Sequence, residues 1–216
     1  AMPSVRPFTV GSPASPARRR VARAALALPI TLLLPLAACH QPTSFQSLDV
    51  SGAAWGKGLQ LKDGVGRTRS LAEFRGQVVL LFFGFTQCPD ICPSAMTEAV
   101  EVLKLLGDDG TKVQVLFVSL DPERDTPEIL QAFIGSFHPS FMALRADMEL
   151  TRKTAEHFKV FFRKVPLAGS YTIEHSAMVY VYDAQGRLRR ALRPGQPPPA
   201  QAAAIKALLD AGVTPA

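Results

Sequence analysis

The hydrophobic pattern of the chain centres on one unbroken apolar run, residues 78–83, which reads V-V-L-L-F-F. A run of this length is too short to cross a membrane, and its Val and Phe content predicts a strand buried on both faces. After Pro93, apolar residues recur at helical spacing, which predicts an amphipathic helix. Cys88 and Cys92 lie between the two elements, at the carboxyl end of the strand, where open α/β sheets place their chemistry.

The remaining pattern alternates strands and helices. Thr126 and Pro127 form a typical helix start, an N-cap followed by proline at the first helical position. We expect residues 171–176 to run into a strand at 177–182, followed by a hairpin turn and a returning strand. The other predicted elements are a hairpin with a helical turn (58–74), strands at 113–120 and 141–144, a helix at 149–158, an extended segment at 160–165, a strand at 187–192, and a helix at 203–209 after a proline break at 197–199.

The main elements follow the order β-α-β-α-β-β-α, which is the order of a thioredoxin-like domain. A hairpin precedes this unit, and an insertion comes before its third main strand. We therefore predict an α/β protein with a thioredoxin-like fold, an N-terminal hairpin extension and one insertion.

The charge of the chain is concentrated at its N-terminus. The sequence has 24 Lys and Arg against 18 Asp and Glu, and five of the arginines fall in residues 1–38, which contain no acidic residue. The rest of the chain is nearly neutral, so the net charge does not indicate a nucleic-acid-binding protein.

The same N-terminal segment has the parts of an export signal: a basic stretch, an apolar segment at residues 24–36, and two alanines before Cys39. The L-A-A-C sequence around Cys39 resembles a bacterial lipobox. A transmembrane anchor is disfavoured because the apolar segment is shorter than the roughly 20 residues needed, whereas a plain secretory signal with an incidental cysteine is the stronger alternative. We predict a lipoprotein-type signal peptide at 1–38, a tether at 39–55 and the folded domain at 56–212.

If Cys39 carries lipid, Cys88 and Cys92 are the two remaining thiols. A disulfide between them would close a short loop and stabilise the fold little, so a chemical role is favoured over a structural one. The predicted helix N-terminus should lower the pKa of both thiols. Two thiolates at this spacing can form a reversible disulfide or bind a soft metal ion.

His175 is the histidine best placed to join them, because we expect it in a strand of the same sheet. Two thiolates and an imidazole form a soft three-ligand set suited to copper in both oxidation states. Zinc also accepts such ligands, but a catalytic zinc would need a general base, and none is evident. Asp121 follows the strand beside the cysteine strand, where a turn or capping role is expected.

Three motifs carry a family resemblance: G-F-T-Q-C-P-D-I-C-P, S-L-D-P-E-R-D-T-P-E and Y-T-I-E-H-S, in this order. Over residues 52–210 the chain resembles the Sco/SenC family, copper-binding thioredoxin-fold proteins that assist assembly of the binuclear copper (CuA) centre of cytochrome c oxidase subunit II. The resemblance implies that Cys88, Cys92 and His175 bind Cu(I) or Cu(II), and that Asp121 supports the site without being a ligand. The sequence departs from the family pattern at Gln87, often His; at Glu174, usually Asp; and at residues 145–148, more typically a Thr-Gly pair.

Two functions are compatible with these residues. The first is a copper metallochaperone for subunit II that works with other periplasmic copper chaperones, anchored by Cys39 to the periplasmic face of the bacterial inner membrane. The second is a thiol–disulfide oxidoreductase that keeps the subunit's cysteines reduced. The spacing favours the first, because three residues separate Cys88 from Cys92, one more than in the C-x-x-C redox motif. Residues 172–176 also lack the proline that thioredoxin-like reductases place opposite their cysteines.

Overall fold

The cysteine strand lies inside a six-stranded mixed sheet with the strand order β1-β10-β9-β4-β5-β6, as seen in the computed structural model, which describes residues 47–212. The strand β4 pairs in parallel with β5 and antiparallel with β9. Every residue of β4 is buried, as its unbroken apolar run predicts. The strands of this sheet are β1 (Ser47–Asp49), β4 (Val78–Gly84), β5 (Val113–Ser119), β6 (Met142–Leu144), β9 (Val179–Tyr182) and β10 (Leu188–Leu192).

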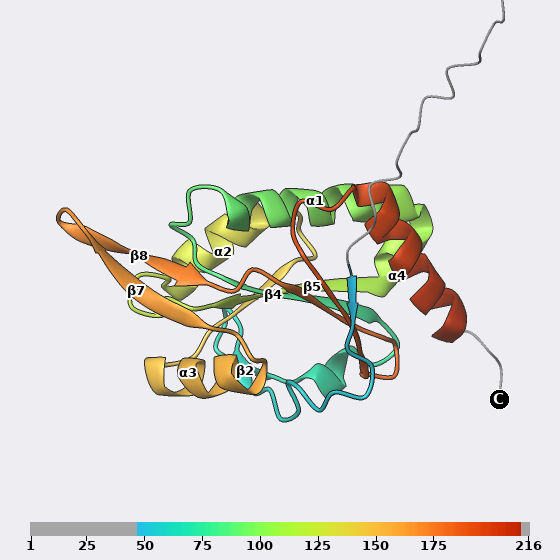
Figure 1. Ribbon diagram of the computed structural model, residues 1–216, viewed down its shortest axis with the longest axis horizontal. Coiled ribbons are helices and arrows are strands. Elements are labelled where there is room, and N and C mark those ends of the chain that lie inside the picture. The colour runs from blue at the N-terminus through green and yellow to red at the C-terminus, as the bar shows by residue number, and fades with distance from the viewer. Residues whose placement is uncertain (1–46, 213–216) are drawn as a thin grey trace, which may run out of the picture. The chain divides into compact units, whose positions relative to one another are not determined.

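Helices cover both faces of the sheet (Figure 1). The helices α1 (Ile91–Leu106), α2 (Pro127–Gly135) and α4 (Pro198–Gly212) lie on one face, and α3 (Met148–His157) lies on the other. The helices α1 and α2 share a face because each connects neighbouring parallel strands, and such crossovers are right-handed. The described residues also contain the 3-10 helices η1 (Leu71–Phe74) and η2 (Gly107–Lys112).

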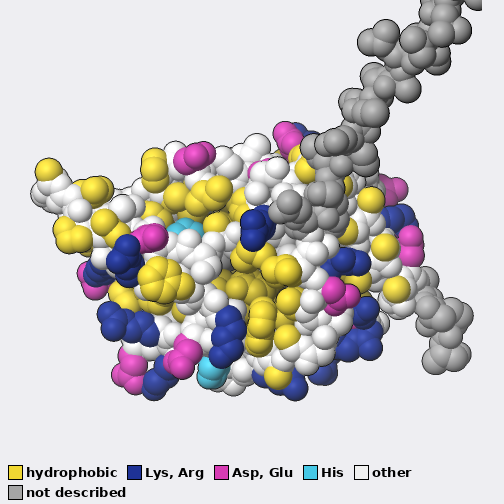
Figure 2. Space-filling model, viewed as in Figure 1, with side chains coloured by type: hydrophobic (Ala, Val, Ile, Leu, Met, Phe, Trp, Pro, Cys, Tyr) yellow, Lys and Arg dark blue, Asp and Glu magenta, His cyan; other side chains and the backbone are white. Residues whose placement is uncertain are grey.

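Two small hairpins flank this unit. The hairpin β2–β3 (Leu61–Lys62 and Thr68–Arg69) is the predicted N-terminal extension, and the hairpin β7–β8 (Phe162–Leu167 and Ser170–His175) is the predicted insertion before β9. The hairpin β7–β8 projects beyond the main sheet, and apolar side chains cluster at its outer end (Figures 1 and 2). Leu167 there is 56% exposed. The thioredoxin-like fold with its extension and insertion is therefore confirmed.

The structure corrects three details of the sequence-based prediction. His175 does not lie in the main sheet as expected: it ends β8, which pairs with β7 in a sheet of its own, and the strand expected at 177–182 begins only at Val179. The final helix begins at Pro198, inside the predicted proline break, because proline is tolerated in a first helical turn, where its missing N–H forms no intrahelical bond.

The third correction concerns the predicted tether. Ser47–Asp49 forms the edge strand β1, which pairs with β10, and Arg190 Nη1 donates to Ser47 Oγ at 3.0 Å. Trp55 packs edge-on against Tyr180, so residues 47–55 belong to the folded domain. The predicted signal peptide, Cys39 and residues 40–46 lie outside the described residues. Within residues 47–212, no helix has the length and apolar character needed to span a membrane.

Candidate metal centre

The cysteine loop joins the end of β4 to the start of α1. Cys92 is the second residue of α1 and is fully buried, whereas Cys88 lies in the loop and is half-buried. The loop is attached to the sheet through Asp125, a fully buried carboxylate that follows β5. Thr86 donates to Asp125 through its amide at 3.2 Å and its hydroxyl at 2.6 Å, and Ser119 Oγ donates at 2.6 Å. Asp125 therefore attaches the cysteine loop to the carboxyl end of β5.

Gly84 allows the sulfur of Cys92 to approach the strand end. A Cβ at position 84 would lie 2.8 Å from Cys92 Sγ and 2.9 Å from Phe117 Cε2, both closer than ordinary van der Waals contact. Glycine is therefore required here for close packing, and the buried thiol occupies the space that a side chain would fill.

His175 reaches the cysteines from the end of β8. Its ring meets the rings of Phe82 and Phe85 edge-on, with centroids 6.2 and 5.9 Å apart. Nδ1 lies 3.0 Å from the backbone oxygen of Ser176. Because a carbonyl oxygen only accepts, this contact places a proton on Nδ1, and in the neutral imidazole the lone pair is then on Nε2. Nε2 lies 3.7 Å from Cys92 Sγ, so the lone pair is available beside the buried sulfur.

The two thiols differ in acidity. The hydrogen bond from Cys92 lowers the pKa of Cys88 to about 5, with help from the backbone N–H groups of Asp90, Cys92 and Ile91 at the start of α1. The pKa of Cys92 is raised, because its proton is held in the bond to Cys88 and because its sulfur is buried. The expectation that the helix N-terminus lowers both pKa values is therefore wrong for Cys92.

The structure brings the predicted ligands together in part. Among residues 47–212, no three His, Cys, Asp or Glu side chains form a group that could hold a metal ion as they stand. The spacing of Cys92 and His175 does fit two ligands of one metal ion. With metal–sulfur and metal–nitrogen bonds of about 2.3 and 2.05 Å and an angle between tetrahedral and trigonal, the sulfur and the nitrogen would lie about 3.6–3.8 Å apart. A three-ligand site therefore requires a shift that brings the sulfur of Cys88 within bonding distance of the same metal ion.

Asp121 is fully buried and contacts the inserted hairpin. Its carboxylate accepts hydrogen bonds from Tyr171 Oη at 2.7 Å and from Arg124 Nε at 2.5 Å, and its backbone oxygen accepts from the amides of Arg124 and Asp125. The expected turn role is confirmed. Sequence reasoning missed the contribution of Asp125, because one D-P-E-R-D turn contains both acids and no sequence signal distinguishes them.

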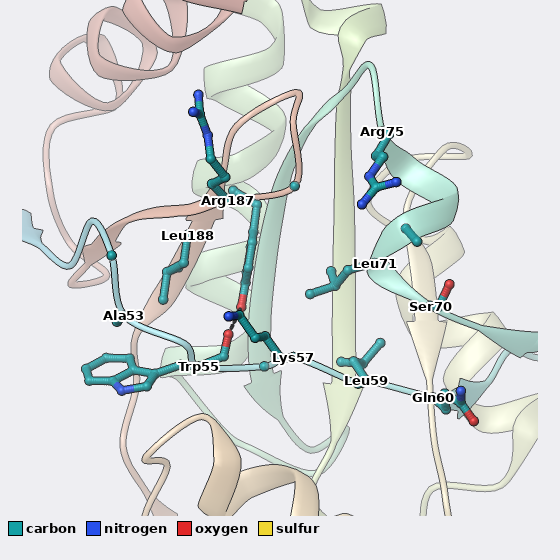
Figure 3. A pocket seen from close by; sticks show the side chains of 16 residues that line it. Ala53, Trp55, Lys57, Leu59, Gln60, Ser70, Leu71, Arg75, Arg187 and Leu188 are labelled. Atoms are coloured by element: carbon teal, nitrogen blue, oxygen red, sulfur yellow. Dashed lines mark hydrogen bonds between the residues drawn. The ribbon is translucent and has the colours of Figure 1, made fainter.

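A cavity of about 440 Å³ lies near the turn between β9 and β10, lined by Trp55, Lys57, Arg75 and Arg187 among other residues (Figure 3). Arg75 and Leu71 come from the region of η1, Leu188 is the first residue of β10, and Arg187 directly precedes it. Its lining contains no cysteine or histidine. This cavity is therefore separate from the candidate metal centre.

Comparisons with known proteins give a consistent result. Residues 50–210 match the SCO1/SenC family model. The chain is 34% identical over 132 residues to an SCO2-like protein of Rickettsia prowazekii, a match that covers 60% of this chain and 64% of that protein. The chain thus spans just under two thirds of this relative.

Solved structures agree. ScoI of Bradyrhizobium japonicum, which was determined with copper bound, is 36% identical and superposes with a TM-score of 0.66, covering 72% of this chain and 99% of that one. The apo Sco1 protein of Thermus thermophilus is 37% identical with a TM-score of 0.64, covering 69% of this chain and 89% of that one. The fold, the cysteine loop and these matches together show that the chain belongs to the SCO1/SenC family.

Proposed function

We propose that the protein binds one copper ion through Cys88, Cys92 and His175 and delivers it to the binuclear copper centre of cytochrome c oxidase subunit II. The observation that carries the proposal is the 3.7 Å approach of His175 Nε2 to Cys92 Sγ, with Nδ1 turned toward the backbone oxygen of Ser176. The copper found in the related ScoI of Bradyrhizobium japonicum supports the identity of the metal. Soft thiolates favour Cu(I), and the imidazole also suits Cu(II), so this ligand set accepts both oxidation states.

The exposure of the ligands suggests a route for transfer. Cys92 is fully buried, while Cys88 and His175 are only partly covered. A ligand of the acceptor can therefore reach the ion from the side of Cys88 and His175. Other periplasmic copper chaperones would supply copper from the same side.

Thiol–disulfide exchange is the second candidate function, favoured by the low pKa of Cys88. The Cys88 thiolate would attack a disulfide of subunit II and form a mixed disulfide. Cys92, after losing its proton, would then attack Cys88, leaving a Cys88–Cys92 disulfide and two reduced thiols on the partner. BsSco, a structural relative at 20% identity, is a Sco-family cytochrome c oxidase assembly protein with a disulfide switch. This reaction makes no use of His175.

A rescue assay in a strain that lacks the gene separates the two functions. Restored oxidase activity should require His175 as well as both cysteines if copper delivery is the function. His157→Ala is the matched control, because His157 is an exposed histidine on α3, away from the cysteine loop. Full rescue by His175→Ala would instead favour thiol–disulfide exchange.

For the location, we propose cleavage before Cys39, lipid attachment to its sulfur, and anchoring at the periplasmic face of the inner membrane. Mass spectrometry of the native protein should find a diacylglyceryl group on an N-terminal Cys39. Cys39→Ser should release the domain from the membrane and leave copper binding by the purified domain unchanged. An uncleaved leader or an unmodified N-terminus would contradict the proposal.

A further inference from the structure

One arginine connects the two segments that carry the candidate ligands. Arg124 lies in the loop between β5 and α2. Its Nη1 atom donates to Gln87 Oε1 at 3.0 Å and to the backbone oxygen of Tyr171 at 2.8 Å. Gln87 directly precedes Cys88, and Tyr171 lies on β8, the strand that ends at His175. A single guanidinium therefore bonds to the cysteine loop and to the histidine hairpin.

The arginine is itself held firmly. Its Nε atom donates to the fully buried carboxylate of Asp121, and its side chain is only 17% exposed. The Arg124 guanidinium stacks on the Tyr171 ring, with Cζ 3.7 Å from the ring centroid, while Tyr171 Oη donates to the second oxygen of Asp121. Arg124, Asp121 and Tyr171 thus form a closed set of contacts. A planar, multidentate guanidinium can make all of them at once, and a lysine ammonium cannot.

The position of the β7–β8 hairpin depends on side-chain contacts such as those of Arg124. The hairpin β7–β8 forms its own two-stranded sheet, so no β-ladder to the main sheet sets its position. Tyr171 and His175 are four residues apart on β8, which corresponds to about 13 Å along a strand. A shift of the hairpin at Tyr171 would therefore be transmitted to His175, changing its separation from the cysteines.

We infer that Arg124 is a positioning residue that sets the place of His175 relative to Cys88 and so stabilises the three-ligand arrangement over a two-thiolate one. The inference rests on the proposed copper site. Cu(II) needs the imidazole, whereas Cu(I) tolerates binding by two thiolates alone. Loss of Arg124 should therefore weaken Cu(II) binding selectively, by about 10- to 100-fold, as found for groups that orient metal ligands from outside the ligand set.

The test compares Arg124→Gln with wild type in Cu(I) and Cu(II) titrations, with the visible thiolate–Cu(II) band as a spectroscopic readout. Arg163→Gln is the matched control: Arg163 is on the same hairpin, but it is 63% exposed and pairs with Glu174. We expect Arg124→Gln to lose Cu(II) affinity and shift the band while keeping its Cu(I) affinity, and Arg163→Gln to behave as wild type. Arg124→Lys should restore the Cu(II) affinity only in part.

Hydrogen exchange of the apo protein gives a readout without metal: amides of β8 should exchange faster in Arg124→Gln and not in Arg163→Gln. If Arg124→Gln does not fold, Gln87→Ala removes only the link to the cysteine loop and should give a smaller change in the same direction. Equal Cu(II)-to-Cu(I) affinity ratios in the folded variant and wild type would overturn the inference. Failure of wild type to bind copper would instead overturn the proposed function.

Discussion

Replacing Gly84 by alanine tests how closely the end of β4 packs against the sulfur of Cys92. The added Cβ would lie 2.8 Å from Cys92 Sγ and 2.9 Å from Phe117 Cε2, so the sulfur or the strand must move by roughly 0.6 Å to restore ordinary contact at 3.4 Å. Overpacking of this kind costs about 1–3 kcal/mol. The lower backbone entropy of unfolded alanine offsets about 0.5–1 kcal/mol. We therefore expect a net loss of up to about 2.5 kcal/mol in the free energy of unfolding, with a central value of about 1 kcal/mol.

The assay is urea denaturation of the reduced apo protein, followed by Cu(II) titration. Gly135→Ala is a suitable control, because Gly135 is the last residue of α2 and a Cβ there would have nothing within 4 Å. The control should match wild type or gain up to about 1 kcal/mol from helix propensity. In Gly84→Ala the thiolate–Cu(II) absorption should also weaken, because the displaced sulfur no longer faces Nε2 of His175.

Close packing at Gly84 is ruled out if Gly84→Ala unfolds with the same free energy as Gly135→Ala and keeps the wild-type copper spectrum. Such a result would mean that the sulfur of Cys92 does not occupy the space beside the strand end. A loss of stability with an unchanged spectrum would support the close packing at Gly84 but would contradict the expectation that a displaced Cys92 sulfur weakens Cu(II) binding.

Two further predictions concern proton equilibria. Burial raises the pKa of Asp125 above its ordinary value of 3.8, so the folded state binds this proton more tightly than the unfolded state. The unfolding free energy of wild type relative to Asp125→Asn should therefore fall as the pH rises from 4 to 7, and a rise would contradict the burial argument. For the thiols, a Cys88 pKa of about 5 and a raised Cys92 pKa predict that iodoacetamide modifies Cys88 first at pH 7 and more slowly below pH 5. Equal rates at both cysteines, mapped by mass spectrometry, would contradict it.

Local patterns predicted the parts of the fold that depend on neighbouring residues. The apolar run of residues 78–83 became the fully buried strand β4, because an unbroken hydrophobic strand needs cover on both faces. Thr126 caps α2 as expected, with its side chain accepting from the amide of Ile129, and Pro127 takes the first helical position. Both results follow from interactions within a few residues.

Long-range pairing could not be predicted in the same way. The residues around Ile173 have strand character, but that pattern does not specify whether β8 pairs with β7 or with the main sheet. The edge strand β1 has only three residues, too few for a periodic signal, and it is ordered by its partner β10. The approach of His175 to Cys92 was anticipated, but from the expectation that His175 lies in the main sheet; it lies instead at the end of β8, just before the chain enters β9 beside β4.

The acidity of the thiols depends on burial, which sequence does not reveal. The helix N-terminus was correctly expected to favour the Cys88 thiolate. Cys92 lies deeper and donates to Cys88, so its pKa moves in the opposite direction. The roles of Arg124 and Asp125 likewise depend on contacts with segments far away in sequence, such as Tyr171 and Thr86.

The three-ligand copper site is tested most directly by a copper titration of wild type, His175→Ala and His157→Ala. We expect one Cu(II) per wild-type protein with strong thiolate–Cu(II) absorption, and the same for His157→Ala. His175→Ala should lose Cu(II) affinity far more than Cu(I) affinity, because both sulfurs remain. Unchanged Cu(II) binding and absorption in His175→Ala would contradict the three-ligand site.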